Sequence, residues 1–144
     1  MKATAAGLTG KALRDGNRAA VGDFVAKQRK YLTGKVLDFG CGKQPYKHLV
    51  DGEYVGFDTD YGRKSSHNLR LSGRFDAILI TAACPEVPAP LIEQLNENGR
   101  LVVPVGPLHT QELLLLKRVG GRIIRKNICP CRFVPLFGEY AFKQ

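Results

Sequence analysis

The feature that most constrains this chain is the run KVLDFGCGKQP at residues 35–45, where an apolar strand ends on Asp38, Gly40 and Gly42. In a parallel α/β sheet, ligands bind beyond the carboxyl ends of the strands, near the point where the strand order reverses. A glycine at that point lets the backbone approach a ligand closely, because it has no Cβ. The amides of the next segment can then face the ligand. The run therefore predicts a ligand-binding turn at the edge of a parallel sheet.

The pattern after this run alternates between strand-like and helix-like segments, which predicts a parallel sheet with helices on its faces. The apolar run at 74–81 is nearly continuous, so we expect a central strand that is buried on both faces. The other expected strands cover 35–39, 53–60, 67–71 and 100–106, and the expected helices cover 17–32, 44–50 and 85–96.

Glycine and proline residues mark the expected ends of these elements. Gly34 is placed to stop the first helix, Pro45 to lie in the first turn of the second, and Asn98-Gly99 to stop the third. Gly120-Gly121 separates two β-type runs at 112–119 and 122–128, which predicts a tight antiparallel hairpin. We expect one α/β domain over residues 1–144, with residues 1–15 loosely ordered.

A second acid, Asp58, follows the second expected strand, 20 residues after Asp38. A carboxylate there can accept two hydrogen bonds from the vicinal hydroxyls of a ribose, although Asp60 is an alternative. The dinucleotide fingerprint requires a third glycine where this chain has Pro45, and Asp38 would repel a pyrophosphate. S-adenosylmethionine carries a ribose, an ammonium and a sulfonium but no phosphate, so the electrostatics favour it over NAD. In the simpler alternatives, the glycines only form a turn and Asp38 only caps it.

Two longer motifs carry a resemblance to known proteins. KVLDFGCGKQPYKHL followed by EYVGFDTD resembles the first motifs of class I S-adenosylmethionine-dependent methyltransferases, whose Rossmann-like sheet ends with an antiparallel strand. The segment from about Arg74 to Glu139, with its runs TAACPEVP, GRLVVPVG and RFVPL, is similar to the C-terminal half of protein-L-isoaspartate O-methyltransferases. The Ser-Gln-Pro segment that this family carries near its acceptor site does not occur before Lys35. The span between the second and fourth expected strands is also short.

This resemblance implies roles at the matching positions. The cofactor's amino-acid and ribose end would lie against the first turn, the ribose against Asp58, the adenine near the two segments that follow, and the methyl-transfer site beside Thr81 and Ala82. The implied cofactor-binding residues are Asp38, Phe39, Gly40, Cys41, Gly42, Asp58, Thr59, Asn68, Leu69 and Thr81. Methyl transfer from a sulfonium needs little acid–base help, so no catalytic residue is assigned.

Charge and cysteine content bear on partners. The formal net charge is +9, and the stretch 113–138 contains no acidic residue, which favours anionic partners, nucleic acid among them. Cys129-Pro130-Cys131 is interpreted as two strand residues on one face, with a thiol redox or metal site as the alternative. The histidines have no ligand-type spacing, so no metal is predicted. No apolar run approaches membrane-spanning length and no signal peptide is evident, so we expect a cytoplasmic protein.

Three functions therefore compete at this point. The first is a methyltransferase that acts on a protein or peptide carboxylate, as the isoaspartyl resemblance implies. The second is a methyltransferase with a nucleic-acid acceptor, which the basic C-terminal stretch favours. The third is a cofactor-binding or scaffold protein without turnover, consistent with the absent acceptor segment.

Overall fold

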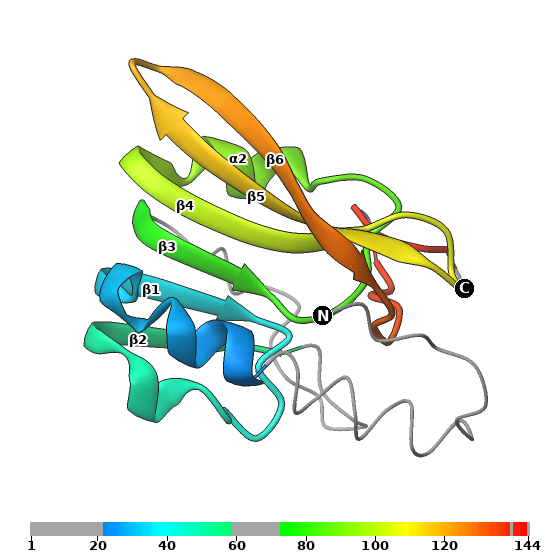
Figure 1. Ribbon diagram of the computed structural model, residues 1–144, viewed down its shortest axis with the longest axis horizontal. Helices are drawn as coiled ribbons and strands as arrows, with labels where there is room; N and C mark the ends of the chain where they lie inside the picture. Colours follow the sequence, from blue (N-terminus) through cyan, green and yellow to red (C-terminus); the bar gives the residue numbers. More distant parts are fainter. Residues whose placement is uncertain (1–21, 59–72, 139, 144) are drawn as a thin grey trace.

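The computed structural model describes residues 22–58, 73–138 and 140–143, which form a sheet of six strands in the order β2-β1-β3-β4-β5-β6 (Figure 1). The strands are β1 (Thr33–Phe39), β2 (Asp51–Phe57), β3 (Phe75–Ile80), β4 (Leu95–Val105), β5 (Gln111–Val119) and β6 (Arg122–Cys131). Residues 22–27 are helical, and three short elements follow: η1 (Arg29–Tyr31), η2 (Lys47–Leu49) and α2 (Ala89–Glu93). This arrangement confirms the expected α/β fold.

One strand of the sheet, β5, runs in the opposite direction to the other five. Pairs β1–β2, β1–β3 and β3–β4 are parallel, whereas β4–β5 and β5–β6 are antiparallel. Only five residues join β4 to β5, too few for the crossover that a parallel pair requires, so β5 must run back along β4. The reversed strand is therefore β5, and β6 again runs in the direction of β1. The expected hairpin is confirmed, but its antiparallel strand lies inside the sheet and not at its end.

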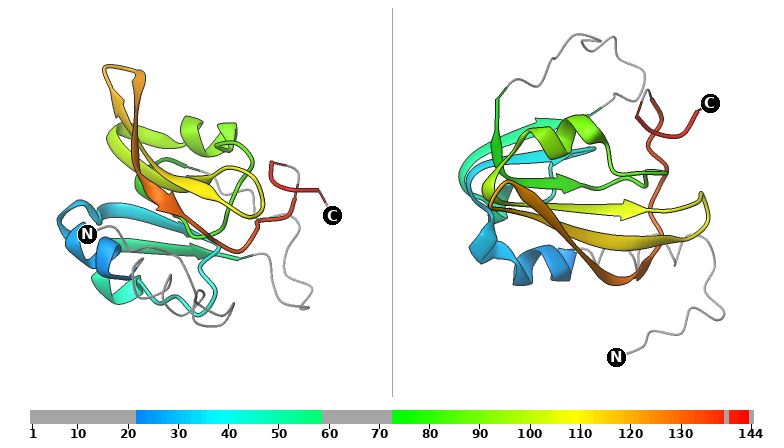
Figure 2. Two further views of the ribbon diagram at one scale, coloured as in Figure 1. Left: turned by 45° about the vertical axis from the view of Figure 1, so that its right-hand side comes forward. Right: turned by 90° about the horizontal axis from the view of Figure 1, so that it is seen from above.

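The two faces of the sheet are covered from opposite sides (Figure 2). Because side chains alternate along a strand, Val36 and Leu37 belong to different clusters. Leu37 and Leu101 pack with Leu91 of α2 on one face, and Val36 packs with Val25 near helical residues 22–27 on the other. The central strand β3 is buried along nearly its whole length, as its sequence predicts.

The β5–β6 hairpin turns at Gly120 and Gly121, whose φ angles of +58° and +74° are typical of a two-residue turn with both central residues left-handed. The carboxylate of Glu97 accepts hydrogen bonds from both glycine amides. The guanidinium of Arg118 donates to the backbone carbonyls of Ile92 (2.6 Å) and Leu95 (2.8 Å). These contacts tie the hairpin to the connection between α2 and β4.

Several expected element boundaries are wrong. Gly34 does not stop a helix; it lies inside β1, where a Cβ would collide with the carboxylate of Asp76. Pro45 precedes η2 and is not in a helical first turn. The third helix ends at Glu93, and Asn98 (φ +61°) lies within β4 beside an irregular register with β3. The expected strand at 67–71, residues 1–15 and residues 17–21 of the first expected helix lie outside the described residues.

Candidate functional site

The carboxyl ends of β1, β2 and β3 are joined by backbone hydrogen bonds. The amides of Gly40 and Cys41 donate to the carbonyl of Phe57, at 2.7 and 3.1 Å. The amide of Thr81 donates to the carbonyl of Phe39 at 3.1 Å, and its hydroxyl donates to the carbonyl of Gly40 at 2.8 Å. After β1 the chain forms β2 on one side of β1 and then β3 on its other side. The strand order therefore reverses at β1. The structure thus places the predicted turn at the switch point of the sheet.

The two glycines of this turn adopt conformations that side-chain-bearing residues avoid. Gly40 has φ +84° and Gly42 has φ +49°. A Cβ on Gly40 would lie 3.4 Å from Thr81 Oγ1, and one on Gly42 would lie 3.7 Å from Asp58 Oδ2. The requirement for glycine is therefore set mainly by the backbone dihedrals and only secondarily by crowding.

Asp58 lies directly against the glycine turn. The amide of Gly42 donates to Asp58 Oδ2 at 2.5 Å, and the Asp58 side chain is partly exposed. Among the described residues no hydrogen bond reaches Asp58 Oδ1, and each carboxylate oxygen can accept more than one hydrogen bond. The strand-end acid and the second glycine, which are 16 residues apart, thus form one polar group. Asp60, the alternative acid, lies outside the described residues.

Asp38 occupies a different position from Asp58. It is fully buried, and its Oδ2 accepts a hydrogen bond of 2.7 Å from the hydroxyl of Tyr54. Its Oδ1 has no hydrogen-bond partner among the described residues. Burial raises the pKa of Asp38, the Tyr54 hydrogen bond opposes this rise, and the charge of Asp58 adds to it. Asp38 is therefore not the turn cap considered above; it lies beneath the turn with one oxygen unpaired.

Sequence reasoning missed two residues of this site, Tyr54 and Phe57. Burial and the Asp38 carboxylate raise the pKa of the Tyr54 hydroxyl, so the phenol stays protonated and acts as a donor to Asp38. The backbone carbonyl of Phe57 accepts hydrogen bonds from the amides of Gly40 and Cys41. The Phe57 ring stacks on the ring of Phe39, with centroids 4.8 Å apart. Both residues lie on β2, and only its parallel register with β1, which pairs Gly56 with Asp38, would have pointed to them.

The cysteines provide no activated nucleophile. Cys41 is buried beside the turn, and its burial, followed by the charges of Asp38 and Asp58, raises the pKa of its thiol. Burial raises the pKa of the Cys84 thiol to about 11. Burial, followed by the charges of Cys129 and Glu112, raises the pKa of the Cys131 thiol to about 12. A thiol acts as a nucleophile or metal ligand in its deprotonated form, and raised pKa values disfavour that form. Cys41 thus fits the expected role of a small packing residue.

Three predicted site residues, Thr59, Asn68 and Leu69, lie outside the described residues, so the adenine side of the site stays a prediction. In the described part of the chain, no group of three or more His, Cys, Asp or Glu side chains is arranged to hold a metal ion. Over the same residues, no helix is long and apolar enough to cross a membrane.

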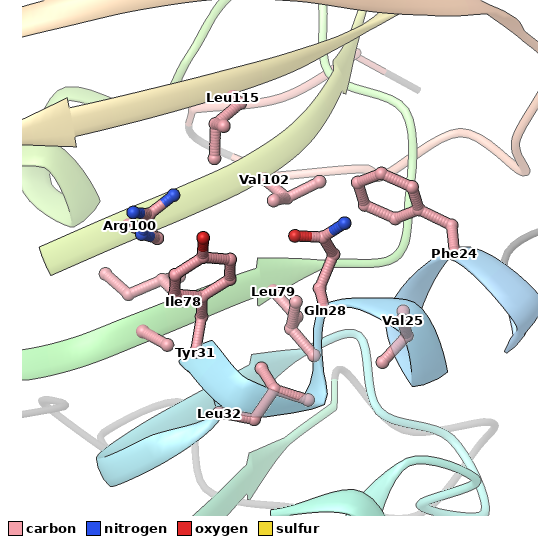
Figure 3. A pocket seen from close by; sticks show the side chains of 11 residues that line it. Phe24, Val25, Gln28, Tyr31, Leu32, Ile78, Leu79, Arg100, Val102 and Leu115 are labelled. Carbon is pink, nitrogen blue, oxygen red and sulfur yellow. The ribbon is translucent and has the colours of Figure 1, made fainter.

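A mainly apolar cavity lies away from the turn, between helical residues 22–27, η1 and one face of the sheet (Figure 3). Tyr31, Val102 and Leu115 are among its lining residues, and the guanidinium of Arg100 lies 3.7 Å from the centre of the Tyr31 ring. Its volume of about 40 Å³ accommodates a few water molecules but not a nucleoside. This cavity is therefore not a candidate cofactor site.

The chemistry of the turn favours a cationic nucleoside ligand. Two carboxylates, Asp38 and Asp58, lie at the ends of β1 and β2 beside the turn, and the charge of Asp58 adds to the rise in the pKa of Asp38. Such a site disfavours a pyrophosphate and suits a ligand with hydroxyl donors and positive charge. The unpaired, buried Asp38 Oδ1 is an acceptor that a positively charged group or an ordered water can satisfy.

Comparisons with known proteins agree on one family. The family model described as protein-L-isoaspartate(D-aspartate) O-methyltransferase matches residues 68–141. A Staphylothermus marinus protein-L-isoaspartate O-methyltransferase is 51% identical over 131 residues, which cover 88% of this chain and 58% of the relative. A Methanoregula boonei protein of the same name is 51% identical over 74 residues, covering 51% of this chain and 34% of the relative. The chain thus spans between one third and three fifths of the length of these relatives.

Solved structures agree on the fold. A Plasmodium falciparum protein-L-isoaspartate O-methyltransferase, determined in complex with S-adenosyl-L-homocysteine, superposes with a TM-score of 0.58. It is 19% identical in sequence, and the match covers 75% of this chain and 68% of that one. A second protein-L-isoaspartate O-methyltransferase superposes with a TM-score of 0.57 at 19% identity, covering 85% of this chain and 48% of that one. At such identities the likeness concerns the architecture of the sheet.

Proposed function

The chain belongs to the protein-L-isoaspartate(D-aspartate) O-methyltransferase family, and from that premise we propose that it binds S-adenosylmethionine and transfers its methyl group to a protein carboxylate. The observation that carries this proposal is the convergence of Gly40, Gly42, Asp58 and Thr81 at the switch point of the sheet.

We assign the described residues to parts of the cofactor by their chemistry. Asp58, held by the Gly42 amide and partly exposed, accepts hydrogen bonds from the two ribose hydroxyls. Gly40 and Gly42 let the backbone approach the ligand, and Phe39 and Cys41 support the turn from below. Asp38 contributes negative charge to the cationic end through its unpaired oxygen, directly or through a water. Thr81 fixes the end of β3 beside the acceptor.

The proposed mechanism relies on positioning. When bound, the cofactor supplies a methyl group that its positively charged sulfur already activates. The chain's residues need to hold an acceptor carboxylate in line with that methyl group and to exclude water. A carboxylate acceptor is ionised at neutral pH and is itself the nucleophile, so no protein base is required. The raised pKa values of the cysteine thiols are consistent with a route without a covalent enzyme intermediate.

Cofactor binding is tested by isothermal titration of the full chain with S-adenosylmethionine. We expect Asp58→Ala to weaken binding by roughly 30- to 100-fold, equivalent to about 2–3 kcal/mol for hydrogen bonds to a charged acceptor. Asp51→Ala is the matched control, because Asp51 is an exposed acid at the opposite end of the same strand. No binding by the wild type, or equal losses in the two variants, would refute the assignment.

Acceptor identity requires a separate experiment. Radiolabelled methyl transfer to an isoaspartyl peptide is compared with transfer to the same peptide containing ordinary aspartate. We expect label in the isoaspartyl peptide alone, bound through a base-labile ester. Cofactor binding without transfer to either peptide would instead support the scaffold alternative and leave the cofactor assignment intact.

A further inference from the structure

The outer edge of β6 is the most prominent part of the described structure that the proposed function does not use. β6 is the outermost strand, and seven of its ten residues are exposed. Within the described residues, no strand pairs with its outer side. Figure 1 shows the β5–β6 hairpin extending past the neighbouring strands at its turn. We propose that this edge binds an extended, acidic polypeptide segment as a seventh strand, independently of the cofactor site.

The turn fixes which backbone groups face outward. In a two-residue hairpin the residues that flank the turn, Val119 and Arg122, form a hydrogen-bonded pair, and such pairs alternate along the ladder. Ile124 and Lys126 therefore bond to β5. The amides and carbonyls of the residues between them point away from the sheet; these are Ile123, Arg125 and Asn127. Three consecutive donor–acceptor sites thus form a template for an added strand.

The positive charge of the β6 edge favours an acidic segment as the added strand. Arg122, Arg125 and Lys126 are exposed on β6, and Arg132 follows the strand. No acidic residue occurs between 113 and 138. Two copies of β6 paired edge to edge would bring these cations together, which disfavours self-association. A segment with alternating acidic residues would place opposite charges across the new strand pair.

The same surface fits a polypeptide better than a nucleic acid. A nucleic acid has no alternating amide and carbonyl groups to satisfy the outward backbone sites. β6 also carries no aromatic side chain on which bases could stack. Ile124 is 56% exposed and gives an added strand an apolar contact beside the cations. Backbone pairing, charge and apolar contact therefore agree on one kind of ligand.

The test uses the full chain and three fluorescent probes of matched length. The first is a ten-residue peptide of alternating Glu and Val, the second replaces Glu with Lys, and the third is a ten-nucleotide oligothymidine. We expect the acidic peptide to bind, as measured by anisotropy, and its affinity to fall as salt rises. Binding of the oligothymidine with no binding of the acidic peptide would overturn the proposal, as would self-association of the free chain in sedimentation experiments.

Two variants separate the contribution of the backbone from that of charge. Asn127→Pro removes one outward amide, keeps every charge and breaks no bond to β5, whereas Asn127→Ala keeps the amide and serves as control. We expect the proline variant to bind the acidic peptide about tenfold more weakly, the equivalent of one lost hydrogen bond, and the alanine variant to bind normally. The double change Arg125→Glu and Lys126→Glu should reverse the preference toward the lysine peptide. Equal binding by the proline and alanine variants would exclude strand addition.

A measurement on the wild type keeps the proposal testable if the proline variant fails to fold. Amide hydrogen exchange is followed with and without the acidic peptide. We expect peptide-induced protection at Ile123, Arg125 and Asn127, and little change at Ile124 and Lys126, whose amides already bond to β5. Protection spread equally over both sets, or absent from both, would contradict pairing at the outer edge.

Discussion

The parallel half of the sheet, β2-β1-β3, and the antiparallel half, β4-β5-β6, are built in different ways. In the parallel half, backbone groups at three strand ends bond to one another, so the site depends on a few dihedral angles and one carboxylate. In the antiparallel half, side chains fix the backbone: Arg118 and Glu97 hold the hairpin in place. We therefore expect substitutions in the first half to change ligand binding, and those in the second to change stability.

The largest expected effect is on stability, from Arg118→Met. The methionine retains much of the apolar stem but leaves the carbonyls of Ile92 and Leu95 without their charged donor. We expect the free energy of unfolding to fall by about 2 kcal/mol, measured by urea denaturation. Cofactor affinity should change by less than about twofold, since the contact lies outside the proposed cofactor turn at residues 40–42. A large affinity loss with unchanged stability would contradict the division into two halves.

Two glycine-to-alanine substitutions sharpen the comparison, because both glycines have similar positive φ angles. Gly40→Ala (φ +84°) and Gly121→Ala (φ +74°) should each lower the free energy of unfolding by about 1–2 kcal/mol. Only Gly40→Ala should also weaken S-adenosylmethionine binding, because Gly40 lies in the proposed cofactor turn and a Cβ there approaches Thr81. Calorimetric titration beside thermal unfolding separates the two effects. Equal affinities for the two variants would remove Gly40 from the site.

A smaller stability effect is expected for Glu97→Ala. This substitution removes the carboxylate that accepts hydrogen bonds from the amides of Gly120 and Gly121. Because the site is exposed, we expect a loss of about 0.5–1 kcal/mol in the free energy of unfolding. Glu93→Ala is the control, since Glu93 is an exposed acid on α2. Comparable losses in the two variants would mean that the loss of negative charge, not of the turn contact, is responsible.

The smallest change in stability is expected for Asp38→Asn, because the amide preserves the shape of the side chain and an acceptor for Tyr54. Burial raises the pKa of Asp38 in the folded state above its unfolded value, so folding favours the protonated acid. Its contribution to stability is therefore fully present below the unfolded pKa and is lost as pH rises through the folded pKa. We expect the variant to be more stable than the wild type at neutral pH, with the difference vanishing near pH 4 or below in urea titrations. A difference independent of pH would exclude titration of Asp38 as its cause.

Much of the fold could be predicted because it depends on local patterns. The apolar run of β3 and the Gly-Gly turn of the hairpin each determine an element without reference to the rest of the chain. The start of β4 was mispredicted because Leu91, Ile92 and Leu95 have helical spacing. In the structure the helix ends at Glu93, and Leu95 enters the sheet beside Phe75. Pairing with a neighbouring strand outweighed the local pattern there.

Part of the candidate site could also be predicted from the sequence. The glycines and the strand-end acid were identified because parallel strands bring their carboxyl ends to one edge. The difference in burial between Asp38 and Asp58 was not predicted, because both acids follow apolar strand residues in the sequence. Burial depends on Tyr54, a side chain from the neighbouring strand whose position follows from register. Sequence patterns thus pointed to the glycine turn and its two acids, but not to the contribution of Tyr54 or to the burial of Asp38.

Because β5 runs against its neighbours, the glycine turn of the hairpin lies at the end of the sheet remote from the cofactor edge. A Cβ on either turn glycine would meet no atom within 4 Å, so there is open space around the turn. A fluorophore or affinity handle inserted there would report on the molecule without contacting the proposed cofactor site. The hairpin therefore offers a natural attachment point for single-molecule or immobilisation studies.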